Sequence, residues 1–133
     1  MVSNGINFYN DSKATNVSSA IAAVNSFSGK NIFLIVGGDS KNQNLSLLSK
    51  ALKNKVKKLY LIGKDAELIQ KACKNLKEVE IRILNTMKEA THQAFINAES
   101  GDIILLAPAC ASYDMYRSYI ERGDDFKSIV ASF

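Results

Sequence analysis

Three polar segments of the sequence combine residue types that bind anions. They read Asp11-Ser12-Lys13-Ala14-Thr15-Asn16, Gly37-Gly38-Asp39-Ser40-Lys41 and Ala107-Pro108-Ala109-Cys110-Ala111-Ser112. Each leads toward a predicted helix, whose free N–H groups at its start favour negative charge. A charge-assisted hydrogen bond contributes about 1.5–3 kcal/mol, and a helix terminus adds about 0.3–1 kcal/mol. Together, these features predict a site for a ligand with carboxylate or phosphate groups.

Each segment taken alone also has an ordinary structural interpretation. Asp11 and Thr15 could be turn and cap residues, Gly37-Gly38 could be a turn after a strand, and Lys41 could be a solvated loop lysine. Structure alone does not require these segments to converge at one place, so their convergence would favour a binding site.

The residues around the three segments predict alternating strands and helices. Apolar runs predict strands at Ile6–Tyr9, Ile32–Val36, Leu59–Ile62 and Ile103–Leu106, and alternating residues predict one near a sheet edge at Val79–Ile83. Helices are predicted over 17–27, 45–52, 66–76 and 87–98, and a helical region after Pro108 is expected to break near Gly123 and to continue to Phe133. This alternation is typical of an α/β fold, with a doubly wound, mostly parallel Rossmann-like sheet, helices on both faces and a single domain. Ligands bind beyond the carboxyl ends of such strands, so we expect the three segments to lie along one rim.

Capping residues mark the ends of two of these helices. Thr15 or Asn16 can cap the first helix, and Ser28-Gly29 is expected to end it. Thr86 and Glu89 form a predicted capping box for the helix over 87–98. These signals support the predicted alternation of strands and helices.

The composition is that of an ordinary globular domain. The chain has 133 residues, of which 47% are hydrophobic and 23% are charged. No apolar run approaches the roughly 18 residues of a membrane span, and the first residues do not resemble a signal peptide, so we expect a cytoplasmic protein. Cys73 and Cys110 match no metal-ligand spacing, and His92 is the single histidine. We therefore predict no metal site, reduced and partly buried cysteines, and a surface or packing role for His92.

The net charge of +4 raises the question of a nucleic-acid partner. The densest basic run covers 50–58, and only Tyr60 follows it, whereas single-stranded nucleic-acid binding would require interleaved aromatic residues. A solvated helix end is the favoured interpretation of this run. The sequence contains neither G-x-x-x-x-G-K-[ST] nor G-x-G-x-x-G after a strand, so the chain alone is not expected to cradle a triphosphate.

The three segments together resemble the MurD family, the UDP-N-acetylmuramoyl-L-alanine:D-glutamate ligases of peptidoglycan precursor synthesis. The Asp11–Asn16 string is similar to the signature at the entry of that family's C-terminal domain, and Gly37–Lys41 is similar to its Gly-Gly-Asp-x-Lys segment. The string Pro108–Ser112, with Asp114 and Arg122-Gly123 beyond it, resembles its last motif. The resemblance runs from about Asn4 to Phe133 and implies that the chain is this C-terminal domain.

The resemblance also implies a reaction and a set of roles. In the family, ATP phosphorylates the carboxylate of UDP-N-acetylmuramoyl-L-alanine, and the amino group of D-glutamate attacks the acyl phosphate. Thr15, Lys41 and Ser112 would hold the two carboxylates of D-glutamate, and Tyr119 would contribute its backbone N–H. Asp11 would reach the nucleotide ribose, and Lys13 would lie near the phosphate and the reaction centre as a catalytic and nucleotide-binding residue.

The sequence departs from the family's pattern in two respects. Ala107 replaces a frequent serine, Ser40 a frequent glycine, and Met115-Tyr116 a usual glutamine and phenylalanine. The family's UDP-binding domain and central ATP- and magnesium-binding domain have no counterpart here. Asn4-Gly5 indicates a turn whose preceding strand would be missing. We therefore expect a fragment that has no ATPase or ligase activity alone.

Three alternatives remain open. The first is the equivalent domain of another Mur or folylpolyglutamate ligase with a different amino acid, which the Asp11–Asn16 string disfavours. The second is a stand-alone Rossmann-like binding module without chemistry. The third is a basic nucleic-acid binder, whose binding would be sensitive to salt.

Overall fold

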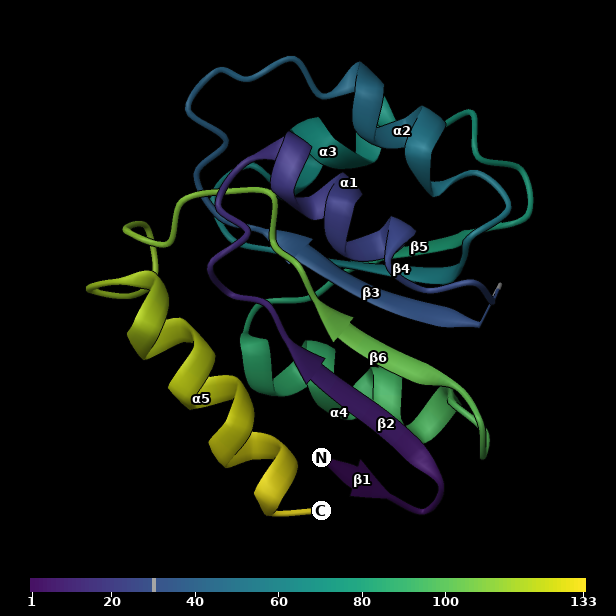
Figure 1. Ribbon diagram of the computed structural model, residues 1–133. Helices are drawn as coiled ribbons and strands as arrows, with labels where there is room; N and C mark the ends of the chain where they lie inside the picture. The colour runs from purple at the N-terminus through teal and green to yellow at the C-terminus, as the bar shows by residue number, and fades with distance from the viewer. Residues whose placement is uncertain (30) are drawn as a thin grey trace.

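The fold is a mostly parallel sheet with helices on both faces (Figure 1). The computed structural model describes residues 1–29 and 31–133. Its elements are β1 (Val2–Ser3), β2 (Ile6–Asn10), α1 (Val17–Asn25), β3 (Ile32–Gly37), α2 (Ser46–Leu52), β4 (Val56–Ile62), α3 (Ala66–Ala72), β5 (Glu80–Ile83), α4 (Met87–Asn97), β6 (Ile103–Leu106) and α5 (Tyr119–Ala131). The strand order is β1-β2-β6-β3-β4-β5, with β1 antiparallel to β2 and the other pairs parallel. The predicted doubly wound, mostly parallel α/β sheet is confirmed.

Two hydrophobic clusters cover the two faces of the sheet. Leu34 and Val36 of β3 pack in a cluster with residues of α1, α2 and α3. Phe33 and Ile35 of the same strand pack in a second cluster with residues of α4 and α5. Figure 1 shows these helices on opposite sides of the sheet. Because β3 is buried on both faces, its sequence is continuously apolar instead of alternating.

Several local sequence signals act as predicted. Asn16 caps α1, and its side-chain oxygen accepts a hydrogen bond from the N–H of Ser19 at 2.8 Å. Thr86 caps α4 by accepting from the N–H of Glu89 at 3.1 Å. The Glu89 carboxylate accepts from Asn85 instead of Thr86, so the capping box is displaced by one residue. β5 lies at an edge of the sheet, as its alternating residues predicted.

Four local expectations were wrong. Residues 107–118 are turns and irregular backbone instead of helix, and α5 continues through Gly123 without a break. The first helix ends at Asn25, before Ser28-Gly29. The strand expected to be missing before Asn4-Gly5 is present as β1, because both residues adopt the positive φ that a tight hairpin turn requires.

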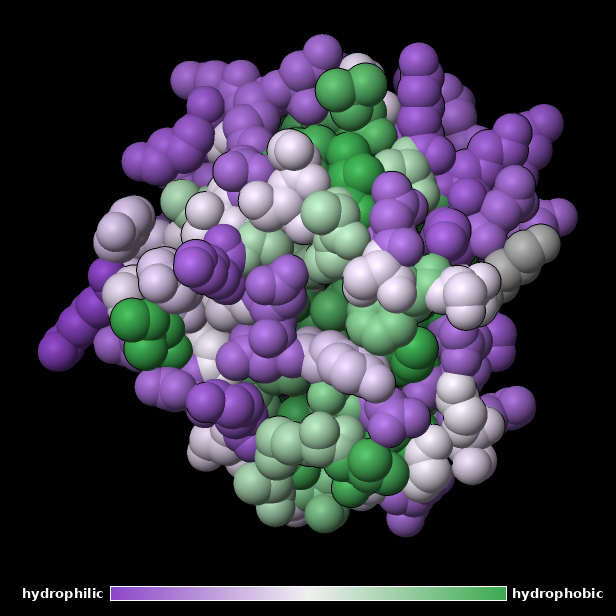
Figure 2. All heavy atoms as spheres, viewed as in Figure 1, coloured by the Kyte–Doolittle hydropathy of each residue, from purple (hydrophilic) through white to green (hydrophobic). Residues whose placement is uncertain are grey.

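Exposed apolar side chains gather at the end of the molecule that holds both termini. Met1, Val2 and Phe133 are partly or largely exposed, and Figure 2 shows hydrophobic surface at the lower end of the view, where Figure 1 places β1 and the termini. In the described part of the chain, no helix has the length and apolar character needed to span a membrane.

Candidate functional site

The three polar segments follow the three adjacent strands β2, β6 and β3, at their carboxyl ends. Hydrogen bonds join them directly. The N–H of Ala109 donates to the carbonyl of Ala14 at 2.9 Å, and Asp39 and Ala111 exchange two backbone hydrogen bonds at 2.9 and 3.0 Å. The expected rim is therefore present, and the segments form a continuous surface on it.

A small hollow of about 160 Å³ lies on this rim. Its lining consists of Thr15, Ala111, Ser112, Tyr113 and Tyr119. Three of the four residues predicted to hold the ligand thus meet in one place, although they come from two segments and the start of α5. Ser112 is only 2% exposed. Its hydroxyl and that of Thr15 are the hydrogen-bonding side-chain groups expected for a carboxylate site.

Tyr119 is the first residue of α5. Ser118 caps this helix by accepting from the N–H of Glu121 at 3.2 Å. The carbonyl of Tyr119 accepts a hydrogen bond from the Ser12 hydroxyl at 2.6 Å. The first N–H groups of a helix have no intrahelical partner and favour negative charge. The backbone N–H of Tyr119 is therefore suited to an anion, whatever its side chain.

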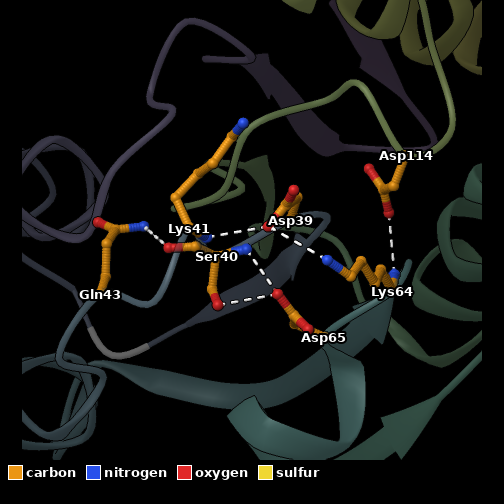
Figure 3. A network of polar contacts seen from close by, with 7 residues as sticks. All are labelled: Asp39, Ser40, Lys41, Gln43, Lys64, Asp65 and Asp114. Carbon is orange, nitrogen blue, oxygen red and sulfur yellow. Dashed lines mark hydrogen bonds and ion pairs between the residues drawn. The ribbon is translucent and has the colours of Figure 1, made fainter.

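Lys41 lies on the rim but is not part of the hollow's lining. Its N–H donates to the Asp39 carboxylate at 3.0 Å, and Figure 3 shows its ammonium pointing away from the surrounding carboxylates. Lys41 and Asn42 have φ values of 52° and 59°, a left-handed conformation that is costly for residues other than glycine. The backbone thus holds an exposed lysine at a position where it can extend over the rim.

A polar network fixes the Gly37–Lys41 segment from below (Figure 3). The N–H and the hydroxyl of Ser40 both donate to Asp65, at 2.7 and 2.8 Å. These hydrogen bonds, the backbone one foremost, lower the pKa of the Asp65 carboxyl. The Lys64 ammonium lies 3.8 Å from the Asp39 carboxylate, and the backbone N–H of Lys64 donates to the Asp114 carboxylate at 2.8 Å. The serine at position 40 therefore supplies a hydrogen bond that glycine could not.

Gln43 is a residue that the sequence analysis missed. Its side-chain oxygen accepts from the N–H of Val17 at 2.8 Å, and its amide nitrogen donates to the carbonyls of Ser40 at 2.8 Å and Ala109 at 3.0 Å. It therefore connects the start of α1 with the other two segments. No sequence signal marks it, because a loop glutamine is usually solvated.

Asp11 and Lys13 lie in the turn before Thr15. The N–H of Asp11 donates to the carbonyl of Leu106 at 2.8 Å, and its own carbonyl accepts from Ala14 at 2.9 Å. Asp11 is half-buried and Lys13 is exposed. The hollow's lining includes neither, so any contact that they make with a ligand lies outside it.

The remaining departures from the family's pattern have structural explanations. The Tyr116 hydroxyl donates to Asp125 at 2.5 Å, and Met115 packs against the second hydrophobic cluster. Ala107 is fully buried in the first cluster, where a serine hydroxyl would require a partner. None of these substitutions removes a group from the lining of the hollow.

The cysteines and the histidine occupy ordinary structural positions. Burial raises the pKa of the Cys73 thiol to about 11 and that of Cys110 to about 12, so both are protonated near neutral pH. Both are completely buried, beyond the partial burial predicted. His92 is exposed on α4, with its ring centroid 6.0 Å from that of Phe133.

A second, larger hollow of about 810 Å³ lies at the opposite end of the sheet. Lys50, Lys53, Lys57 and Lys77 are among its lining residues. Lys57 pairs with Asp102 at 3.1 Å, and the neighbouring Lys58 pairs with Glu80 at 3.1 Å. This hollow contains none of the three polar segments. We take the smaller hollow as the candidate site, because the half-buried Thr15, the buried Ser112 and a helix start converge there.

The sequence matches the family described as Mur ligase, glutamate ligase domain, over residues 1–110. The UDP-N-acetylmuramoylalanine–D-glutamate ligase of Nitrosomonas europaea is 45% identical over 127 residues, which cover 96% of this chain and 26% of that protein. The ligase of the same name from Francisella philomiragia is 45% identical over 128 residues, covering 96% and 30%. The chain belongs to the Mur ligase family and corresponds to its glutamate ligase domain, which confirms the family inferred from the motifs.

Among solved structures, the chain is similar to a domain from Haemophilus ducreyi 35000HP. That domain is assigned to a UDP-N-acetylmuramate:L-alanyl-γ-D-glutamyl-meso-diaminopimelate ligase. The TM-score is 0.66 at 13% identity, with 97% of this chain and 95% of that domain covered. At this identity the likeness supports the fold alone. The chain spans only 26–30% of the length of the curated relatives named above.

Proposed function

We propose that this chain is the D-glutamate-binding, C-terminal domain of an ATP-dependent ligase that adds D-glutamate to UDP-N-acetylmuramoyl-L-alanine for peptidoglycan. Two findings support this. The relatives at 41–46% identity are named as D-glutamate ligases. The hollow formed by Thr15, Ser112 and Tyr119 is the observation that carries the proposal, because it joins hydroxyl donors to a helix start.

In this proposal the two carboxylates of D-glutamate bind Thr15, Lys41, Ser112 and the backbone N–H of Tyr119. The Ser112 hydroxyl and the helix start would orient one carboxylate, and the flexible Lys41 ammonium would approach the other from above the rim. This arrangement would present the ligand's amino group to an acyl phosphate. Formation of the amide bond would then release phosphate.

Asp11 and Lys13 are proposed to face the nucleotide. Both precede Thr15 on the rim, outside the hollow. Asp11 would accept a hydrogen bond from the ribose, and the exposed Lys13 ammonium would stabilise negative charge on the transferring phosphoryl group as a catalytic residue. The described residues contain no group of three metal-ligating side chains, and no phosphate-cradling motif occurs in the sequence. We therefore propose that ATP and Mg²⁺ are bound mainly outside this chain.

The rest of the activity is proposed to reside elsewhere in the whole protein, in a UDP-binding N-terminal domain and a central domain that binds ATP and Mg²⁺. We propose a cytoplasmic location and no nucleic-acid or membrane partner. The purified 133-residue chain, incubated with ATP, UDP-N-acetylmuramoyl-L-alanine and D-glutamate, should release no ADP above background. Measurable turnover would contradict the proposal that the ATP- and UDP-binding functions reside in other domains.

Two substitutions in the full-length ligase test the assigned site. Lys41→Ala should raise the KM for D-glutamate by at least about tenfold, because it removes a charged donor worth roughly 1.5–3 kcal/mol. Thr15→Val should cost less, because it removes one neutral hydrogen bond. Lys50→Ala, at the opposite end of the sheet, is the matched control. Unchanged D-glutamate kinetics in Lys41→Ala would remove this residue from the site.

A separate experiment tests which amino acid binds at the proposed site. We expect D-glutamate, but not meso-diaminopimelate or L-lysine, to shift the amide resonances of Thr15 and Ser112 in a titration monitored by NMR. A response to meso-diaminopimelate alone would favour a ligase with another acceptor amino acid.

A further inference from the structure

Arg122 is a buried arginine on α5 whose side chain holds two rim segments together. It is 2% exposed. Its Nε donates to the Ser12 hydroxyl at 2.9 Å and one Nη to the Ser12 carbonyl at 2.8 Å, while the other Nη donates to the Cys110 carbonyl at 3.0 Å. The planar guanidinium thus fastens Asp11–Asn16 to Ala107–Ser112, with a geometry that a lysine ammonium does not reproduce.

Ser12 extends this connection to the start of α5. Its hydroxyl accepts from Arg122 and donates to the carbonyl of Tyr119 at 2.6 Å. The adjacent Gly123 allows the close approach, because a Cβ there would lie 3.2 Å from the Cβ of Ser12. Arg122 therefore contacts both segments that line the hollow and, through Ser12, the helix start beside it.

The charge of Arg122 has no carboxylate partner in contact. All three of its acceptors are neutral oxygens, and none of the four ion pairs found among the described residues includes it. A buried cation with only neutral partners is costly. The lining of the hollow includes Ala111, one residue beyond Cys110, and Tyr119, one helical turn before Arg122. Burial lowers the pKa of the Arg122 guanidinium, and the Asp114 carboxylate lies near enough to oppose this shift but does not contact it. An anion in the hollow would add further opposite charge.

We infer that Arg122 is a positioning residue, whose buried guanidinium fixes the two segments around the hollow and supplies positive charge that favours a carboxylate there. The identity of that carboxylate, D-glutamate, rests on the proposed function. The positioning itself does not, because it concerns contacts within the chain.

The positioning is tested by amide hydrogen exchange in Arg122→Met. The reporter is the N–H of Ala109, which donates to the carbonyl of Ala14 across the two segments at 2.9 Å. We expect its exchange to accelerate by at least about tenfold, the effect of losing one charge-assisted hydrogen bond, while the N–H of Leu34 in the central strand is unaffected. Lys127→Met, which removes an exposed charge from the same helix, is the control. Equal Ala109 exchange in wild type and Arg122→Met would overturn the inference.

The contribution of the Arg122 charge to carboxylate binding is tested by titrating the same variants with D-glutamate. Arg122→Met should weaken binding at least about tenfold, Arg122→Lys should restore part of the loss by restoring the charge, and Lys127→Met should bind within twofold of wild type. Equal affinity in wild type and Arg122→Met would overturn the inference. If the wild type fails to bind D-glutamate, the proposed function loses its support, and the exchange rates still decide the positioning.

If Arg122→Met does not fold, Ser12→Ala and Arg122→Lys replace it. Both keep the buried charge but remove contacts that join the segments, so both should accelerate exchange at Ala109. Binding should weaken less than tenfold, since the charge remains. Wild-type exchange in both of these variants would overturn the positioning.

Discussion

At the scale of single residues, the side-chain amide of Gln43 connects the start of α1 with two of the three rim segments. Gln43→Met keeps a similar size but leaves the N–H of Val17 and the carbonyls of Ser40 and Ala109 without this partner. Because each neutral hydrogen bond contributes about 0.5–1.5 kcal/mol, we expect a loss of roughly 2–4 kcal/mol in the free energy of unfolding, measured in urea.

Gln70→Met provides a control for this substitution, because Gln70 is exposed on α3. It should change stability by less than about 0.5 kcal/mol. If both variants were equally stable, the bridging role of Gln43 would be contradicted.

The Ser40–Asp65 pair predicts a dependence of stability on pH. The pKa of Asp65 is lowered mainly by the backbone N–H of Ser40, with a further contribution from its hydroxyl. A lowered folded-state pKa stabilises the protein above the unfolded-state pKa, and this stabilisation is lost as pH falls through the folded value.

Ser40→Ala removes the hydroxyl and keeps the N–H, so the pKa of Asp65 should rise part of the way toward its usual value. The variant should be less stable than wild type at neutral pH, and the difference should shrink in acid. Carboxyl NMR titration measures the pKa, and urea unfolding at several pH values measures the stability. A constant difference at all pH values would exclude this pair as its cause. Ser18→Ala, on the exposed face of α1, is the control.

The residues that line the hollow could be predicted from the sequence, but the side chains that hold the rim segments together could not. Thr15, Ser112 and Tyr119 were predicted from motifs, and they meet in one hollow. Their roles toward D-glutamate stay predictions. Gln43 was not predicted, and the contacts of Arg122 were not either. Each of these side chains joins residues far apart in the chain, and such contacts leave no periodic pattern in a sequence.

At the scale of elements, α5 illustrates a competition between helix propensity and packing. A glycine inside a helix costs about 1 kcal/mol relative to alanine, which is why Gly123 was expected to break the helix. The helix continues because Gly123 is buried against Asn10 and Ser12, where a Cβ would lie 2.8 Å from the Asn10 side-chain amide. Close packing thus outweighs the local preference.

Gly123→Ala should therefore destabilise the protein despite its better helix propensity. Overpacking costs about 1–3 kcal/mol and the propensity gain offsets about 1 kcal/mol, so we expect a net loss of roughly 1 kcal/mol in the free energy of unfolding. Ser128→Ala, on the exposed face of the same helix, should be neutral or slightly stabilising. A more stable Gly123→Ala would show that α5 can move away from the rim at no cost.

At the scale of the whole molecule, the strand order determines which segments can form a site. The chain visits β2, then β3, then β6, yet β6 lies between the other two. The last polar segment is therefore placed between the first two, and it bonds to both. The alternation of strands and helices predicted the parallel sheet, but the order of strands depends on pairings between distant residues, which the sequence pattern does not contain.

The two hydrophobic clusters share this sheet, so we expect the chain to unfold as one cooperative unit. Leu34 and Ile35 are adjacent residues of β3 that belong to different clusters, and both are fully buried. Leu34→Ala and Ile35→Ala should each lower the free energy of unfolding by about 2–5 kcal/mol. Leu68→Ala, at an exposed position of α3, should change it by less than about 0.5 kcal/mol.

If the chain unfolds as one unit, each core variant should shift the entire urea-unfolding transition and not only the part that belongs to one face of the sheet. Far-UV circular dichroism reports both helical layers, and tyrosine fluorescence is accessible because the chain has five tyrosines and no tryptophan. Both probes should give the same urea midpoint within each variant. If Ile35→Ala lowered the fluorescence midpoint while the dichroism retained a separate transition, the two faces would be independent units. Thr15 lies just before α1, which packs on one face of the sheet, and Tyr119 begins α5, which packs on the other. A sheet that unfolds as one unit would therefore hold these two residues of the hollow in a fixed relative position.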